Sequence, residues 1–316
     1  MGLGTWSWGN QLLWGYDESM DPELQELFDL MVKSGVNLFD TADSYGTGRL
    51  NGRSEQLLGR FIRENPSSAA VRDNLHVATK FATYPWRIFP SSIVSACKQS
   101  LERLGTDQLA VGQLHWSASN YAPWQEGALQ TGLADCYEQG LVKAVGVSNY
   151  GPKQLRKVHA ALLERGVPLA SAQIQYSLLS CGSQQESLKA LCDDLGIAVI
   201  AYSPLALGVL SGKYSMDNLP EGPRGLLFKQ LLPEVQPLIS VIDAIAEERK
   251  KTPSQVCLNF LMCQGTIPIP GTKSLSQAEE NLGALGWKLD SGELTELKTT
   301  AAGLKRGMVQ NIFQTA

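Results

Sequence analysis

Short runs of apolar and β-branched residues alternate along the chain with longer segments whose apolar residues recur at helical spacing. The short runs are continuously apolar, which is typical of parallel strands buried on both faces. We therefore predict eight strands, at residues 2–8, 36–41, 75–80, 109–116, 142–149, 170–177, 198–205 and 267–271.

The segments between these runs predict helices. Asp21 and Pro22 read as an N-cap followed by a proline at the first helical position, and Gly35 is placed to end that helix. Thr252 and Pro253 repeat the same opening. Further helices are expected at 53–64, 90–104, 125–139, 152–165, 183–195, 234–250, 275–285 and 290–302.

Eight strand–helix units predict an α/β protein, a single-domain (β/α)8 TIM barrel over residues 1–316. A doubly wound sheet is the alternative, but the fingerprint G-x-G-x-x-G is missing after the first strand, where Gly2-Leu3-Gly4 lacks a third glycine. The longest irregular stretch, about 206–232, is expected to be a mobile loop that covers a ligand, and a C-terminal tail is expected at about 290–316.

The amino-acid composition excludes several classes of protein. The chain is 43% hydrophobic and 18% charged with a net charge of −4, which excludes disorder and gives no basic stripe for nucleic acid. Six cysteines without a C-x-x-C pair and three histidines predict no metal site. With no signal peptide and no membrane-length apolar run, we expect a cytoplasmic protein, or a plastid one if this is a trimmed form.

Polar residues close several of the apolar runs. Asp40 ends the second predicted strand, Lys80 the third and His115 the fourth, and Tyr45 follows in the loop after Asp40. Singly, each has an ordinary explanation: a structural Asp40–Lys80 ion pair, a hydrogen-bonded core histidine and a loop tyrosine. Because strand ends of a barrel meet at one mouth, where active sites lie, their shared position predicts a site.

Six short segments follow each other along nearly the whole chain, namely Asp40–Gly46, Ala78–Lys80, Leu114–Trp116, Gly146–Asn149, Ala201–Pro204 and Ile269–Lys273. Together and in register, they resemble the successive signatures of the aldo-keto reductase family. The resemblance implies a (β/α)8 barrel that uses NADPH to reduce aldehydes and ketones. The Trp-rich start looks most similar to the plant and cyanobacterial branch.

The resemblance implies a catalytic tetrad of Asp40, Tyr45, Lys80 and His115. Tyr45 is expected to be the general acid toward a carbonyl oxygen while the nicotinamide delivers hydride to carbon. The Lys80 ammonium is expected to lower the pKa of Tyr45, and Asp40 to keep Lys80 charged. His115 is expected to hydrogen-bond the same oxygen.

It also implies a site for NADPH/NADP+. Tyr202 is expected to stack on the nicotinamide, and Ser148, Asn149 and Gln173 to bind its carboxamide. The remaining residues expected to bind the cofactor are Thr5, Trp6, Ser203, Leu205, Gly208, Gly271, Thr272, Glu280 and Asn281.

The phosphate end of this site departs from the family pattern. Lys273 and Ser274 precede a predicted helix N-terminus, which favours the 2′-phosphate of NADPH over NADH. Gln277 stands where well-known relatives carry an arginine, and it lacks the charge and the fork geometry. Lys213 or Arg224, in the long loop, is a candidate to supply that charge.

Aromatic residues dominate the expected substrate pocket. Trp86 and Trp116 are the main candidates, with Trp6 or Trp8, Trp14 and Phe313 behind them. An uncharged aromatic wall favours apolar or aromatic carbonyl compounds. We expect a monomer that binds a small-molecule carbonyl substrate, with no nucleic acid and no membrane. The alternatives are a slow nicotinamide-binding regulatory or redox-sensing subunit, and a barrel lyase or hydrolase without nicotinamide.

Overall fold

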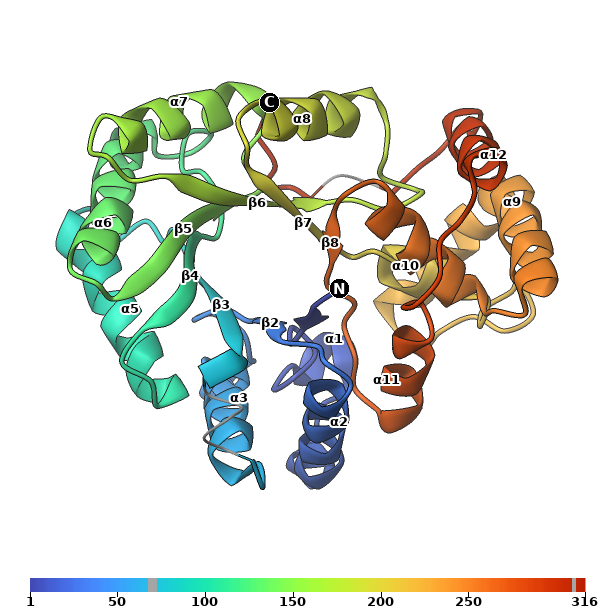
Figure 1. Cartoon of the computed structure of the whole chain (residues 1–316), viewed down its shortest axis with the longest axis horizontal. Coiled ribbons are helices and arrows are strands. Elements are labelled where there is room, and N and C mark those ends of the chain that lie inside the picture. Colours follow the sequence, from blue (N-terminus) through green and yellow to red (C-terminus); the bar gives the residue numbers. More distant parts are fainter. Residues whose placement is uncertain (68–72, 309–310, 316) are drawn as a thin grey trace.

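The computed structural model describes residues 1–67, 73–308 and 311–315 of the chain. Eight parallel strands follow each other in sequence order around a barrel, with helices outside them (Figure 1). This confirms the predicted (β/α)8 fold. The strands are β1 (Leu3–Gly4), β2 (Leu38–Asp40), β3 (His76–Phe81), β4 (Leu109–Leu114), β5 (Val142–Ser148), β6 (Leu169–Gln175), β7 (Ala198–Tyr202) and β8 (Ile267–Pro268).

Backbone hydrogen bonds between the first and last strands close the barrel. Gly2 N donates to Pro268 O at 2.9 Å, and Gly4 N donates to Pro270 O at 3.1 Å. Closure leaves no free sheet edge, and it brings the residues after β8 next to those after β1. Segments from the two ends of the sequence therefore share one mouth of the barrel.

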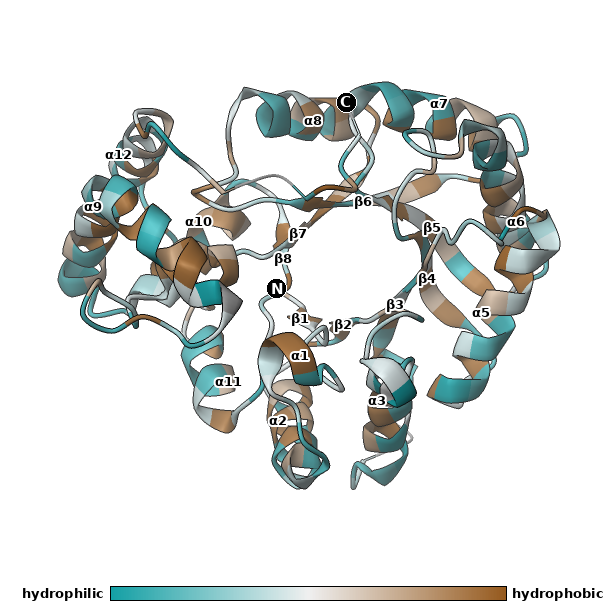
Figure 2. Ribbon diagram, turned by 180° about the vertical axis from the view of Figure 1, so that it is seen from behind, coloured by the Kyte–Doolittle hydropathy of each residue, from teal (hydrophilic) through white to brown (hydrophobic). Residues whose placement is uncertain are grey.

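The helices form the outer layer, and several of them carry both hydrophilic and hydrophobic residues (Figure 2). A surface helix with one buried face has this composition. The helices are α1 (Gln11–Trp14), α2 (Asp21–Lys33), α3 (Arg53–Glu64), α5 (Pro90–Leu104), α6 (Glu126–Glu138), α7 (Pro152–Leu163), α8 (Ser183–Asp194), α9 (Pro223–Arg249), α10 (Pro253–Cys263), α11 (Leu275–Leu282) and α12 (Ser291–Ala302).

The start of α2 differs from the prediction. Asp21 is the first helical residue and not the N-cap, because the 3-10 turn Glu18–Met20 leads directly into the helix. Its carboxylate accepts a hydrogen bond from Tyr16 Oη at 2.6 Å and pairs with Arg53 at 2.7 Å. The Asp21 side chain thus joins α2 to α3 and does not cap a helix.

The long loop expected at about 206–232 is shorter than predicted. A 3-10 segment covers Ala206–Ser211, and α9 begins at Pro223, eleven residues before the predicted helix start at 234. Gly225 and the internal Pro233 and Pro237 conceal this helix in the sequence, since both residue types disfavour a helix interior. Its buried face begins at Phe228 and continues with helical spacing.

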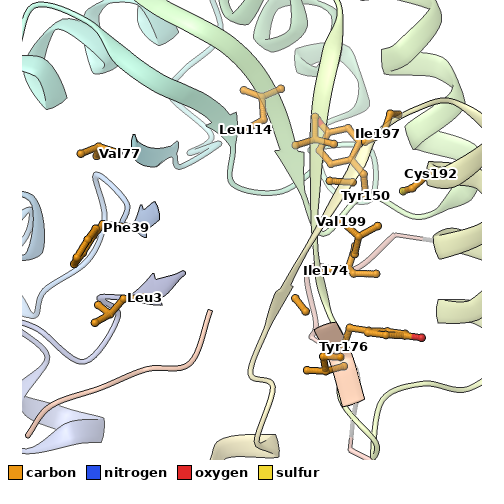
Figure 3. Packing of buried hydrophobic residues seen from close by; sticks show 14 of the residues in the cluster. Leu3, Phe39, Val77, Leu114, Tyr150, Ile174, Tyr176, Cys192, Ile197 and Val199 are labelled. Carbon is orange, nitrogen blue, oxygen red and sulfur yellow. The ribbon is translucent and has the colours of Figure 1, made fainter. Parts of the chain in front are cut away.

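Successive strand residues point to opposite sides of the barrel wall. Phe39 packs outward against Phe28 of α2, with ring centroids 5.0 Å apart, while its neighbour Asp40 faces the interior. Leu3 and Val77, on the flanking strands, are buried with Phe39 in the same core cluster (Figure 3). The same alternation sends Lys80 inward from β3. No helix in the part of the chain that the structure describes is long and apolar enough to cross a membrane.

Candidate active site

A cavity of about 550 Å³ lies at the carboxyl ends of the strands. Its walls come from the carboxyl end of β6, from the segments after β1, β2, β4, β5, β7 and β8, and from the C-terminal segment. This is the end of a (β/α)8 barrel at which active sites are found. Three residues of the expected tetrad line it, namely Asp40, Tyr45 and His115.

Asp40 and Lys80 form a buried ion pair at the base of this cavity. Lys80 Nζ lies 2.6 Å from Asp40 Oδ2, and both side chains are at most 2% exposed. Lys80 also donates to Thr41 O at 2.6 Å, and Gln173 Nε2 donates to Asp40 Oδ1 at 2.6 Å. Burial lowers the pKa of Lys80, while Asp40 acts in the opposite direction. Each charge therefore depends on the other to remain in the interior.

Tyr45 lies over this pair, with Lys80 Nζ 4.9 Å from the centre of its ring. Burial raises the pKa of Tyr45 well above 10, and the negative charge of Asp40 adds to the increase. The net shift is therefore upward, and not the net lowering expected from Lys80, because burial is the largest influence on this phenol. Tyr45 is a neutral phenol that carries a proton across the physiological pH range.

His115 is the neighbour of Tyr45, with ring centroids 5.7 Å apart. Burial lowers the pKa of His115 well below 6.5, and the positive charges of Lys80 and Arg87 act in the same direction. The imidazole is therefore neutral at pH 7. Ser44 Oγ lies 3.3 Å from Nδ1, and when the hydroxyl donates to that atom the ring proton sits on Nε2.

The Asn149 side chain links the ends of three strands by hydrogen bonds. Its Nδ2 donates to His115 O at 3.0 Å and to Ser148 Oγ at 3.1 Å, and its Oδ1 accepts from Tyr202 Oη at 2.7 Å. Its φ of 60° is a left-handed conformation that few non-glycine residues adopt. Such strain is typical of functional sites.

Three cations gather on the β7–β8 side of the cavity. Lys213 Nζ lies 2.9 Å from Glu280 Oε2, and Lys273 Nζ donates to Trp14 O at 3.2 Å. The Arg224 guanidinium lies 5.0 Å from the centre of a Trp14 ring. Positive charge is thus concentrated where the segments after β1, β7 and β8 meet at the cavity.

Comparison with known proteins shows which family the chain belongs to. Residues 1–302 match the profile of the aldo/keto reductase family. The chain belongs to this family. Among its relatives, a chloroplastic pyridoxal reductase of Arabidopsis thaliana is 58% identical over 315 residues, covering 100% of this chain and 86% of that protein. An uncharacterized oxidoreductase of Mycobacterium bovis is 34% identical over 320 residues, covering 100% and 93% of the two chains.

Solved structures share the fold of this aldo/keto reductase. A glycerol dehydrogenase of Gluconobacter oxydans has a TM-score of 0.81 at 23% identity, covering 99% of this chain and 94% of that one. An aldo/keto reductase of Klebsiella pneumoniae, in complex with NADP and acetate, has a TM-score of 0.73 at 24% identity, covering 98% and 94%.

Three residues expected to bind the cofactor in this aldo/keto reductase do not line the cavity. Thr5 Oγ1 donates to Asp40 O at 2.9 Å, Thr272 Oγ1 accepts from Asn281 Nδ2 at 3.1 Å, and Ser274 caps α11. In the structure their side chains are hydrogen-bonded to other residues of the fold. The expected residues that do line the cavity are Trp6, Ser148, Asn149, Gln173, Tyr202, Ser203, Leu205, Gly208, Lys213, Arg224, Gly271, Lys273, Gln277, Glu280 and Asn281.

Some of the aromatic residues expected in the substrate pocket line the cavity, and others do not. Trp116 lines the cavity and stacks on Phe313, with ring centroids 4.4 Å apart. Trp86 does not line it: its side chain is 71% exposed and stacks on Tyr84 at 4.6 Å. Trp8 is buried in the core. Trp116 and Phe313 therefore form the aromatic wall, and the pocket role expected of Trp86 is not what the structure shows.

Sequence reasoning missed Gln113 and Ser44. Gln113 lies inside β4 and donates to Asp40 Oδ1 at 3.4 Å. A polar residue within an apolar run is a signal, as it is for Gln173 in the run at 170–177. Ser44, which contacts His115, is a hydroxyl in a polar loop and has no such signal.

Proposed function

We propose that this protein reduces an aldehyde to an alcohol with NADPH as the source of hydride. The observation that carries the proposal is the placement of Tyr45 and His115 side by side on the cavity wall, over the buried Asp40–Lys80 pair. A neutral phenol and a neutral imidazole are two donors suited to one carbonyl oxygen.

The cavity suits a long anionic ligand with many polar groups. Ser7 Oγ, Trp14 Nε1 and Arg224 Nε are buried without a partner among the described residues, and all three residues line the cavity. A ligand with acceptor atoms would satisfy such groups. Tyr202 and Ser148 would hold the nicotinamide, Ser203, Leu205 and Gly208 the pyrophosphate, and Lys273, Gln277 and Asn281 the adenosine end.

The residues of the chain then act on the substrate. His115 orients the carbonyl oxygen by donating from Nε2, and Tyr45 gives the same oxygen its proton. The phenolate left on Tyr45 is stabilised by the Lys80 ammonium, which Asp40 keeps protonated. When bound, the nicotinamide supplies the hydride that reaches the carbonyl carbon.

Pyridoxal is the substrate that we propose first. The Arabidopsis relative that is 58% identical over 315 residues is named a pyridoxal reductase. The wall formed by Trp116 and Phe313 supports a flat aromatic aldehyde, because aromatic rings favour offset or edge contacts with another ring.

Consumption of NADPH at 340 nm with purified protein and pyridoxal tests the proposal. We expect the loss of NADPH to match the pyridoxine formed, and to stop when pyridoxamine, which has no aldehyde, replaces pyridoxal. 4-Nitrobenzaldehyde serves as a second aromatic aldehyde. If NADPH quenches tryptophan fluorescence but neither aldehyde is reduced, the regulatory subunit becomes the better interpretation. If no nicotinamide cofactor binds, the proposal is wrong.

The proposal extends to the cellular compartment and the oligomeric state of the protein. The name of the Arabidopsis relative, which includes the word chloroplastic, supports the plastid alternative to the cytoplasm. A monomer is the expected assembly, and a mass near 34.3 kDa in light scattering would agree with it.

A further inference from the structure

We propose that Gln113 is a positioning residue for the Asp40–Lys80 pair, an inference that rests on the reductase function proposed above. Gln113 lies in β4, two residues before His115, and its side chain is fully buried. It is not among the residues that line the cavity. Its Nε2 donates to Asp40 Oδ1 at 3.4 Å, so it acts on the ion pair and does not touch substrate or cofactor.

Asp40 Oδ1 has two amide donors whose surroundings differ. Gln173 Nε2 donates at 2.6 Å, but Gln173 also lines the cavity, where a bound ligand would compete for its amide. Gln113 does not line the cavity, so a ligand there would not compete for its amide. If a bound carboxamide took the Gln173 amide, Gln113 would remain as an amide donor on this oxygen. A carboxylate without enough donors is poorly stabilised in a buried site.

The surroundings also determine which way the Gln113 amide faces. With Oε1 toward Asp40, two acceptors would oppose each other, so Nε2 takes that side. Oε1 then has no partner within the described part of the chain, and neither has Ser171 Oγ, which lies with the Gln113 side chain beside Gly146. An unsatisfied buried oxygen is costly, and an apolar side chain would avoid the cost. The glutamine is therefore explained by its bond to Asp40 and not by packing.

Lys80 is the group through which Gln113 would act on the reaction. Burial lowers the pKa of Lys80, and Asp40 is the largest influence that raises it. Loss of the Gln113 donor frees Asp40 to move from Lys80, so the pKa of Lys80 falls further and the ammonium is lost at a lower pH. The titratable groups that face Lys80 are Asp40 and Asp43 from β2 and its loop, Glu55 from α3, Tyr45 and His115.

Gln113→Met tests the inference, because methionine keeps the length and volume but removes the donor. The readout is the side-chain NMR titration of Lys80 in the folded full-length protein, with its resonance assigned by its loss in Lys80→Arg. We expect the Lys80 midpoint to fall by about one pH unit, as loss of a weak charge-assisted hydrogen bond predicts. With pyridoxal, the alkaline limb of kcat should move in the same direction, with little change in KM.

Val145→Ala is the matched control. Val145 is fully buried on the neighbouring strand β5, and its truncation costs packing energy. A structural role for Gln113 predicts that both variants lower the Tm and leave the Lys80 midpoint unchanged, and that result would overturn the inference. If the wild type reduces no aldehyde, the proposed function fails, while the Lys80 titration still decides the role of Gln113.

A second variant covers the case in which Gln113→Met does not fold. Gln113→Glu keeps the shape and adds a negative charge beside Asp40, so the pKa of Lys80 should rise. A Lys80 midpoint that does not differ from the wild type would also contradict the inference.

Discussion

Removing Lys80 should show how strongly the two charges at the base of the cavity depend on each other. Lys80→Met takes away the ammonium that lies 2.6 Å from Asp40 Oδ2 and leaves a carboxylate that is 2% exposed. Loss of one partner of a buried pair costs about 3–5 kcal/mol. Asp40→Asn together with Lys80→Met removes both charges, so the double variant should recover about 2–3 kcal/mol of the summed losses.

Urea unfolding at pH 7, followed by tryptophan fluorescence and circular dichroism, gives the four free energies of unfolding. The exposed pair between Arg165 and Glu138, at 2.6 Å, is the control, and its coupling should stay below about 1 kcal/mol. If the losses of Asp40→Asn and Lys80→Met simply add in the double variant, the two residues are not an energetically coupled pair and the account of the site is wrong.

Three further predictions follow from the same contacts. Lys273→Ala should weaken NADPH binding about tenfold or more while NADH binding changes little, as measured by quenching of tryptophan fluorescence. An equal loss of affinity for both cofactors would reject the assignment of Lys273 to the 2′-phosphate. Phe313→Ala should raise KM for pyridoxal through loss of the stack on Trp116, with the affinity for NADPH as an internal control that should not change. Burial raises the pKa of Glu55 above 4.5, so the contribution of its protonation to stability is present at low pH and is lost as the pH rises through the folded pKa. Arg103→Met removes the cation beside Glu55, so it should raise that pKa further and lower the Tm more at pH 8 than at pH 5. An equal loss of Tm at both pH values would contradict this prediction.

The strands could be predicted because a parallel strand buried on both faces leaves an uninterrupted apolar run. The start of α9 could not, because its glycine and two prolines signal a loop, while the burial of its apolar face outweighs their local cost. Asp21 shows the same limit, since a helix-capping residue type is used there for an ion pair with Arg53.

The grouping of Asp40, Lys80 and His115 could be predicted because they lie at the ends of neighbouring strands, and strand ends of a barrel meet. Their roles as a tetrad with Tyr45 were expected from the family resemblance. Motif matching could not show which side chains reach the cavity, as Thr272 and Trp86 demonstrate: one is used by a hydrogen bond inside the fold and the other faces solvent. The protonation of Tyr45 also needed the structure, because it depends on how deeply the phenol is buried and on the nearby charge of Asp40.

Tyr45→Phe tests the central claim most directly, since it removes one hydroxyl and keeps the ring beside His115. The measurement is the rate of NADPH oxidation with pyridoxal, taken after fluorescence titration has shown that the variant still binds NADPH. We predict that kcat falls by about 10²–10⁴, the range for loss of a general acid. A variant that binds NADPH and reduces pyridoxal at the wild-type rate would contradict the assignment of Tyr45 as the proton donor.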